Sequence, residues 1–247
     1  MEVKSVKILG VKIHQVTNET AYNRFLALME QPKLSIICTP NTEIVMEAQN
    51  DSELKEILQD ADLVIPDGIG LIYASKIHQL GLTERVTGID TLERILKYAN
   101  NTKKSIYLFG GKPGVADKAA ERMIEVYPNL QIKGIRDGYY KKEEEDKIIN
   151  HINEVKPDIL FVALGAPRQE KWIYNNRKIL NAKVAMGVGG ALDVWAGSAK
   201  RAPKFFQNMH LEWFYRLLKN PTRIGRMMSL PKFMIKVLIS RDFNRPS

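Results

Sequence analysis

A carboxylate at Asp67, in the segment Pro66-Asp67-Gly68, is the strongest candidate in this sequence for acid–base chemistry. It comes directly after a short apolar run at 63–65, which predicts a buried strand. The flanking proline and glycine would hold the carboxylate rigidly at the strand end, beside the start of the next helix. The same features are typical of a helix N-cap or a turn, so the spacing leaves both the catalytic and the structural interpretation open.

Two further polar loops follow apolar runs in the same way. Thr39 and Asn41 come after the run at 34–38, and Gln169 comes after the run at 158–164. Because ligands bind at the carboxyl ends of parallel strands, we expect these loops to converge with the first one at one edge of a sheet. Hydroxyl and amide groups there could bind a sugar. The two residues of the first loop could equally cap a helix, and Gln169 could be a surface helix residue.

Glycine-rich segments offer a third kind of site. Gly110 and Gly111 follow the run at 105–109 and precede a predicted helix, an arrangement that suits phosphate binding by backbone N–H groups. The segment lacks the Lys-Ser/Thr ending of a P-loop and the spacing of a dinucleotide fingerprint. For the second cluster, at 187–190, we predict close packing of a strand against a helix.

Metal ligands are not expected from the sequence. The four histidines, His14, His78, His151 and His210, lack ligand spacing, and a surface or structural role is the simpler interpretation. The Asp-x-Asp pattern at 60–62 precedes a strand, at the edge opposite the predicted ligand face. We therefore interpret it as the end of a helix and a turn.

The elements that must position these residues follow a βα alternation. Amphipathic stretches, such as 89–99 and 112–127, separate short runs rich in β-branched and aromatic residues. The alternation predicts one compact, Rossmann-like α/β domain over 1–199, with a mainly parallel sheet flanked by helices. The N-terminal segment 6–16 predicts a small hairpin that turns at Gly10. The six strand-forming runs are 34–38, 63–65, 105–109, 130–135, 158–164 and 183–188.

The C-terminal segment 200–247 differs from this body in charge. It holds 11 Lys or Arg against two acidic residues, Glu212 and Asp242, whereas 1–199 holds 26 of each sign. Its aromatic and aliphatic residues predict a helical, basic, amphipathic appendage that meets an anionic, partly apolar surface, with a membrane as the first candidate. Part of its apolar stripe could instead pack on the core, and its basic face could be simply solvated.

Location follows from three further features. The N-terminus lacks the apolar stretch of a signal peptide, and the most apolar tail segment, 227–240, is shorter than the ~20 residues that span a bilayer. The single cysteine, Cys38, excludes an internal disulfide. We expect a cytoplasmic protein that associates peripherally with the inner face of the cell membrane.

Six segments, in order over roughly residues 10–230, together resemble the WecG/TagA/CpsF family of bacterial glycosyltransferases. They are TPNTEIVMEA (39–48), DLVIPDGIG (62–70), ERVTGIDTLERIL (84–96), LFGGKPGVA (108–116), PDILFVALGAPRQEKWI (157–173) and GVGGALDVWAG (187–197). The resemblance implies transfer of a sugar from a UDP-sugar to a polyprenyl-diphosphate-linked acceptor at the cytoplasmic membrane face. The TagA branch, which this chain resembles most, uses UDP-N-acetylmannosamine and undecaprenyl-diphosphate N-acetylglucosamine to build the teichoic acid linkage unit.

The resemblance also implies roles for particular residues. Asp67 would be the general base for the acceptor's 4-hydroxyl, in one displacement that inverts the anomeric centre to a β-linkage. Arg85 would reach a phosphate or a sugar, although a surface salt bridge explains it equally well. Thr39, Asn41 and Gln169 would hold the sugar, and Arg216, Arg223 and Arg226 would bind the lipid diphosphate. We expect no metal and no cofactor, so that Arg, Lys and backbone N–H groups stabilise the departing UDP.

Other functions remain open at this point. The same family with another UDP-sugar donor, an N-acetylmannosamine uronic acid or a hexose, would use the same residues. A nucleic-acid-binding module would explain the basic tail but not the polar loops, so nucleic acid is not an expected partner. A nucleotide-sugar oxidoreductase or epimerase would need a dinucleotide fingerprint, and the segment 34–43 contains no glycine. A homo-oligomer is compatible with the sequence.

Overall fold

The computed structural model describes residues 3–219, 225, 228–240 and 243–244 of the chain. The side chains of Asn208, Arg216 and Asn244 lie outside that description. The centre of the molecule is a six-stranded sheet in the order β4-β3-β8-β7-β5-β6, in which each neighbouring pair is parallel. Its strands are β3 (Ser35–Cys38), β4 (Leu63–Val64), β5 (Ser105–Gly110), β6 (Gln131–Arg136), β7 (Ile159–Ala163) and β8 (Val184–Gly187). All six apolar runs are therefore strands, and the predicted α/β class is confirmed.

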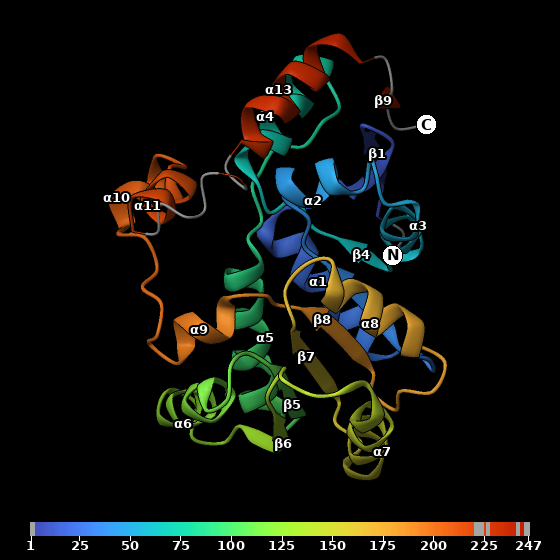
Figure 1. Ribbon diagram of the computed structural model, residues 1–247, viewed down its shortest axis with the longest axis vertical. Helices are drawn as coiled ribbons and strands as arrows, with labels where there is room; N and C mark the ends of the chain where they lie inside the picture. The colour runs from blue at the N-terminus through green and yellow to red at the C-terminus, as the bar shows by residue number, and fades with distance from the viewer. Residues whose placement is uncertain (1–2, 220–224, 226–227, 241–242, 245–247) are drawn as a thin grey trace.

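Helices cover both faces of this sheet, as Figure 1 shows for α8 on one side and α5 and α6 on the other. Successive residues of β3 illustrate the two sides, because Ile36 belongs to one buried cluster and Ile37 to the other. The first face carries α2 (Thr42–Glu47), α3 (Ser52–Asp60), α4 (Ile69–His78), α7 (Glu145–Val155) and α8 (Arg168–Asn176). A short 3₁₀ turn, η1 (Lys142–Glu144), directly precedes α7. The second face carries α1 (Asn18–Met29), α5 (Gly88–Thr102), α6 (Val115–Val126) and α9 (Ala191–Trp195).

Helix α5 shows how the sequence sets these elements. Its buried residues Leu92, Ile95, Leu96 and Ala99 recur at helical spacing and form one apolar stripe. Thr87 is its N-cap and accepts a hydrogen bond from the Asp90 N–H at 3.2 Å. This cap fixes the residue at which α5 begins, and the start of α5 is part of the candidate site described below.

The predicted N-terminal hairpin is present as β1 (Ser5–Ile8) and β2 (Val11–His14). Its turn residues Leu9 and Gly10 both have positive φ, 50° and 74°, as a tight hairpin turn requires. A two-residue strand near the C-terminus, β9 (Phe243–Asn244), pairs antiparallel with β1. The sequence did not predict this pairing, because two residues carry no readable periodicity.

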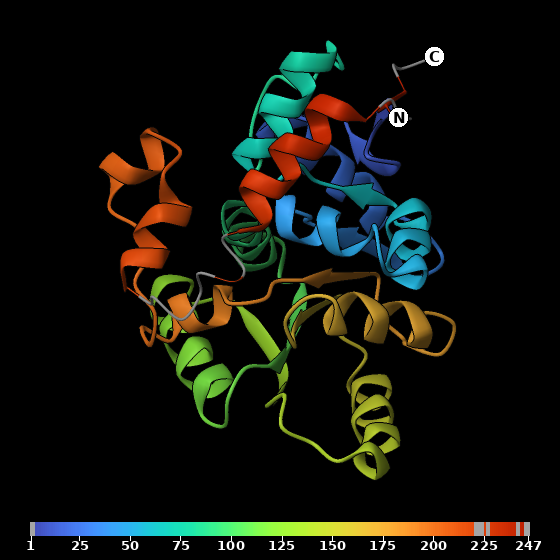
Figure 2. The same cartoon turned by 45° about the horizontal axis from the view of Figure 1, so that its top comes forward.

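The C-terminal segment contains α10 (Lys204–Asn208), α11 (Glu212–Lys219) and α13 (Ser229–Ile239). Figure 2 shows α13 lying beside α4, whereas α10 and α11 stand apart from the sheet. Phe233 and Val237 of α13 are completely buried in the same core cluster as the α2 and α4 side chains. In the part of the chain that the structure describes, no helix has both the length and the apolar character of a membrane span.

Candidate functional site

The carboxyl ends of β3, β4, β7 and β8 open into one cavity of about 950 Å³. This volume suits a ligand of the size of a nucleotide sugar. The loops after these four strands line it, together with the segment before α5, Lys112 and residues of the tail. Five of the residues that the sequence singled out lie together in this lining: Thr39, Asn41, Asp67, Arg85 and Gln169.

Asp67 directly precedes Gly68, the N-cap residue of α4, but its side chain caps the start of α5. Its Oδ2 accepts a hydrogen bond from the Gly88 N–H at 3.1 Å, while α4 has no side-chain cap. A Cβ at Gly88 would lie 3.3 Å from that Oδ2 and 3.0 Å from the Thr39 Oγ1, so glycine lets both side chains approach the helix terminus. The hydrogen bond from the α5 N-terminus therefore fixes the position of the carboxylate.

Asn41 has the capping role that the sequence allowed, and it also lies at the cavity. Its Oδ1 accepts a hydrogen bond from the Ile44 N–H at 3.1 Å and caps α2, and the residue also lines the cavity. Gly68 packs against it, since a Cβ there would come within 3.3 Å of the Asn41 Cα and Cβ. The Asp67 N–H donates to the Pro40 carbonyl at 3.1 Å, so the loop after β3 and the loop after β4 are joined directly.

Gln169 is a buried residue of the cavity wall, which excludes the alternative of a surface helix position. It is 4% exposed, its Oε1 accepts from the Gly189 N–H at 3.0 Å, and its Nε2 donates to the Glu170 Oε1 at 2.9 Å. A Cβ at Gly187 would lie 2.6 Å from the same Nε2. Gln169 thus ties the β8 loop to the start of α8.

Glu170 was not predicted as a site residue, because a Glu in a helix rich in polar residues is ordinarily exposed to solvent. Burial raises the pKa of this carboxyl group, and its Oε2 has no hydrogen-bond partner in the described part of the chain. Its other oxygen accepts from Gln169. Its position beneath the cavity wall therefore supports the orientation of the Gln169 amide.

Arg85 forms an ion pair with Glu212, the first residue of α11, with 2.5 Å between Nη2 and Oε1. Both side chains are only 12% exposed, and both line the cavity. The pair is thus a partly buried salt bridge and not the surface salt bridge that the sequence allowed. Glu212 was not a sequence candidate, because 127 residues separate it from Arg85.

The tail supplies a wall of the cavity through α11 and the residues before it. His210, Trp213, Tyr215 and Lys219 belong to the lining together with Glu212. Of the three residues expected to bind a lipid diphosphate, Arg223 and Arg226 lie outside the described residues, as does the Arg216 side chain. Basic side chains of the described lining are Arg85, Lys112, Lys200 and Lys219, and acidic ones are Glu43, Glu47, Asp67, Asp193 and Glu212.

The first glycine segment packs two strands together and does not face the cavity, whereas Gly187 of the second packs β8 closely against Gln169 of α8, as predicted. Gly110 and Gly111 do not line the cavity. A Cβ at Gly110 would come within 2.4 Å of the Ala163 backbone, and the Gly111 N–H donates to the Ala163 carbonyl at 2.9 Å. This segment packs β5 against β7, whereas Gly189 and its neighbour Gly190 line the cavity.

Three of the four histidines, all except His210 of the cavity lining, have structural partners, and the Asp-x-Asp pattern lies at a helix end. The His14 Nδ1 accepts from the Val64 N–H, His151 bonds the Tyr107 hydroxyl, and His78 bonds the Val237 carbonyl. Helix α3 ends at Asp60, as predicted for the segment 60–62. Within the described ranges, no three His, Cys, Asp or Glu residues are grouped as metal ligands.

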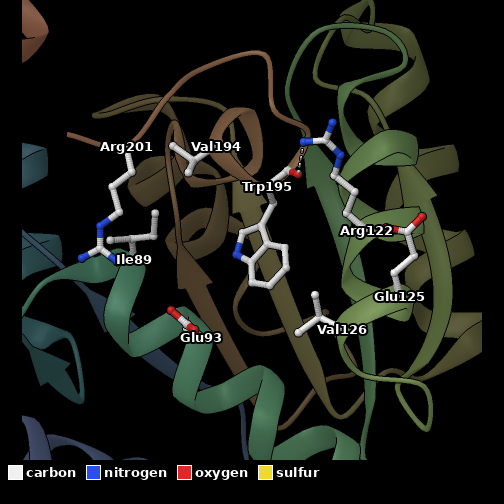
Figure 3. A pocket seen from close by; sticks show the side chains of 8 residues that line it. All are labelled: Ile89, Glu93, Arg122, Glu125, Val126, Val194, Trp195 and Arg201. Atoms are coloured by element: carbon white, nitrogen blue, oxygen red, sulfur yellow. Dashed lines mark hydrogen bonds between the residues drawn. The ribbon is translucent and has the colours of Figure 1, made fainter. Parts of the chain in front are cut away.

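A second, smaller cavity of about 350 Å³ lies between α5, α6 and α9 (Figure 3). The Trp195 side chain stands in its middle, and Arg122 donates to the Trp195 carbonyl at 3.5 Å. Arg201 lies at one end and pairs with Asp90 at 2.6 Å. Ile89 and Val194 line both cavities, so the two are neighbours.

Known proteins are similar to this chain over most of its length. The model of the glycosyl transferase WecG/TagA/CpsF family matches residues 6–246. A relative from Bacillus spizizenii is 40% identical over 96% of this chain and 91% of its own length. One from Bacillus subtilis is 39% identical over 83% and 79%, and one from Staphylococcus aureus is 35% identical over 94% and 91%. All three are named N-acetylglucosaminyldiphosphoundecaprenol N-acetyl-beta-D-mannosaminyltransferase. With a match over nearly its full length, this chain belongs to the WecG/TagA/CpsF family of glycosyltransferases.

Proposed function

We propose that this protein transfers N-acetylmannosamine from UDP-N-acetylmannosamine to the 4-hydroxyl of undecaprenyl-diphosphate-linked N-acetylglucosamine, in the synthesis of the teichoic acid linkage unit. The observation that carries the proposal is the cavity at the strand ends, in which Thr39, Asn41, Asp67 and Gln169 converge. The acceptor and the transferred sugar are those in the name shared by relatives at 35–40% identity over most of the chain.

Asp67 acts as the general base in this proposal. Its carboxylate accepts the proton of the acceptor hydroxyl while the hydroxyl oxygen attacks the anomeric carbon, and the bond from that carbon to the UDP oxygen breaks. One displacement inverts the anomeric centre and gives the β-linkage. The support is geometric, because the Gly88 N–H holds the carboxylate in the cavity wall at the end of β4.

The departing UDP carries negative charge that the site must stabilise. Lysine side chains from three parts of the chain, Lys112, Lys200 and Lys219, line the same cavity as Arg85. The positive end of the α5 dipole lies at the same cavity, which Thr87, Gly88 and Ile89 line, and adds a fixed partial charge. We propose that these groups, without a metal ion, stabilise the leaving group.

We propose that the surface formed by α13 and α4 faces the membrane and serves the lipid-linked acceptor. Helix α13 exposes Ile235, Leu238 and Ile239 at 60–76%, and α4, which packs against α13, exposes Tyr73 and Ile77 at 44% each. Lys232 is exposed on the same helix. An apolar surface with basic residues suits peripheral binding to the anionic inner face of the cell membrane.

The test is UDP release from a panel of UDP-sugars with a short-chain prenyl-diphosphate N-acetylglucosamine acceptor, with the product mass confirmed. We expect release with UDP-N-acetylmannosamine and a loss of about 100-fold or more in Asp67→Asn, as for removal of a general base. Asp117→Asn is the matched control, because Asp117 is exposed on α6 and does not line the cavity.

The other outcomes are equally informative. A near-normal rate in Asp67→Asn would exclude Asp67 as the base. Release with another UDP-sugar alone would keep the reaction class and reassign the donor. No release with any donor, from a folded protein that binds vesicles, would contradict the proposed reaction.

A further inference from the structure

We propose that Glu212 is a positioning residue for donor binding, whose carboxylate holds the Arg85 guanidinium where the diphosphate of the nucleotide sugar binds. This inference rests on the proposed function and adds a residue of the tail to the donor site. The first observation is the ion pair itself, because both partners line the cavity and are only 12% exposed.

The backbone before α5 is firmly anchored, but this does not fix the end of a long side chain. The Val86 N–H donates to the Pro66 carbonyl at 3.2 Å, and Val86 is completely buried. The Arg85 Cα therefore has a fixed place two residues from the α5 cap. A guanidinium on a flexible stem loses its freedom only where a partner holds it, and Glu212 is such a partner.

The geometry of the pair leaves room for a ligand. The observed contact joins the Arg85 Nη2 to the Glu212 Oε1. A guanidinium has further N–H donors on its other edges, and these match the oxygens of a phosphate. Arg85 can thus keep Glu212 on one side and bind a diphosphate on another.

The surroundings explain why the position of Arg85 needs this support. The described lining contains the acidic side chains of Glu43, Glu47, Asp67 and Asp193 besides Glu212. A half-desolvated guanidinium that lost its partner would pair with another carboxylate, because an unpaired buried charge is costly. Pairing with Asp67 would remove the base and the phosphate ligand together. Glu212 lies in the first turn of α11, and its ion pair with Arg85 prevents the guanidinium from pairing with Asp67.

Two substitutions of Glu212 should affect UDP binding differently. Glu212→Ala removes the partner of Arg85, so UDP affinity should fall roughly 10-fold, the size of one hydrogen bond to a charged group. Glu212→Gln keeps an oxygen that accepts the hydrogen bond and removes the negative charge beside the phosphate. UDP affinity should therefore equal or exceed that of the wild type.

The experiment measures the dissociation constant of UDP by calorimetry on the full chain, and then KM for the donor and kcat. We expect Glu212→Ala to raise KM with a smaller change in kcat. Arg85→Ala should weaken UDP binding similarly, and the double variant should lose no more than Arg85→Ala alone. The matched control is Arg201→Ala, which breaks the Arg201–Asp90 pair beside the second cavity, and should leave UDP affinity unchanged.

Three results would overturn the inference. They are wild-type UDP affinity in Glu212→Ala, additive losses in the double variant, or an equal loss in Arg201→Ala. If Glu212→Ala does not fold, Glu212→Gln decides, because a loss as large as that of Arg85→Ala would contradict a positioning role. A wild-type protein that binds no UDP would instead refute the proposed function.

Discussion

His14 gives the protein a stability that depends on pH, through the junction between the N-terminal hairpin and the sheet. Its Nδ1 accepts the Val64 N–H at 2.8 Å, and the side chain is 9% exposed. Burial, with smaller contributions from the positive charges of Lys12 and Arg24, lowers the pKa of His14 from 6.5 to about 4. Protonation would place a proton where the ring must accept one, so we expect acid to weaken the attachment of β4, the strand that leads to Asp67.

The sign and the size follow from proton linkage. The unfolded chain takes up this proton near pH 6.5 and the folded chain near pH 4, so the unfolded state binds more protons between these values. Stability is complete above pH 6.5 and falls as the pH drops towards 4. At 1.36 kcal/mol for each pKa unit, the free energy of unfolding should fall by about 2 kcal/mol between pH 7 and pH 5 because of this residue alone.

Urea unfolding of the wild type and of His14→Asn at both pH values measures this contribution. Asparagine keeps an acceptor close to the Nδ1 position and does not titrate, and other ionisable groups contribute equally to both proteins. We expect the wild type to lose about 2 kcal/mol more than the variant between pH 7 and pH 5. Equal losses in the two proteins would refute the linkage argument.

Three further predictions concern the metal, the tail and the β8 loop. Turnover in excess chelator should match turnover without it, and full loss would contradict a metal-independent site. Phe233→Ala should lower the free energy of unfolding by about 3–5 kcal/mol, because this ring is completely buried between α13 and the body. Leu238→Ala, at 66% exposure on the same helix, should change it by less than about 0.5 kcal/mol, and equal effects would argue against the packing of α13. Gly187→Ala should cost about 1–3 kcal/mol in urea unfolding and raise KM for the donor, because its Cβ would displace the Gln169 amide 2.6 Å away. Unchanged stability and KM would show that the amide does not need this position.

The sheet could be predicted because its signal is local. Each strand run is short, apolar and bounded by polar or glycine-containing segments, and β3, β5, β7 and β8 are buried along their whole length. Since the carboxyl ends of parallel strands meet at one edge, Thr39, Asp67 and Gln169 could be assigned to a common site before their contacts were known.

The side-chain contacts at this edge of the sheet could not be predicted from the sequence. Asp67 has a glycine next to it that suggested a cap of α4, but its partner is Gly88 at the start of α5. Gly110 looked like a phosphate loop and is instead packed on Ala163. A glycine is required wherever backbone approaches another group, and the sequence does not say whether that group is a ligand or a neighbouring strand.

The βα order, the edge at which the candidate site residues meet and the charge of the tail follow from the sequence, because hydrophobic periodicity and charge are properties of neighbouring residues. The burial of Phe233, the pairing of β9 with β1 and the contact of Glu212 with Arg85 across 127 residues depend on the folded chain. Such pairings depend on which surfaces meet when the chain closes on itself. An amphipathic tail presents the same periodicity to a membrane and to its own core, and the packing of α13 on α2 and α4 shows that part of it uses the core.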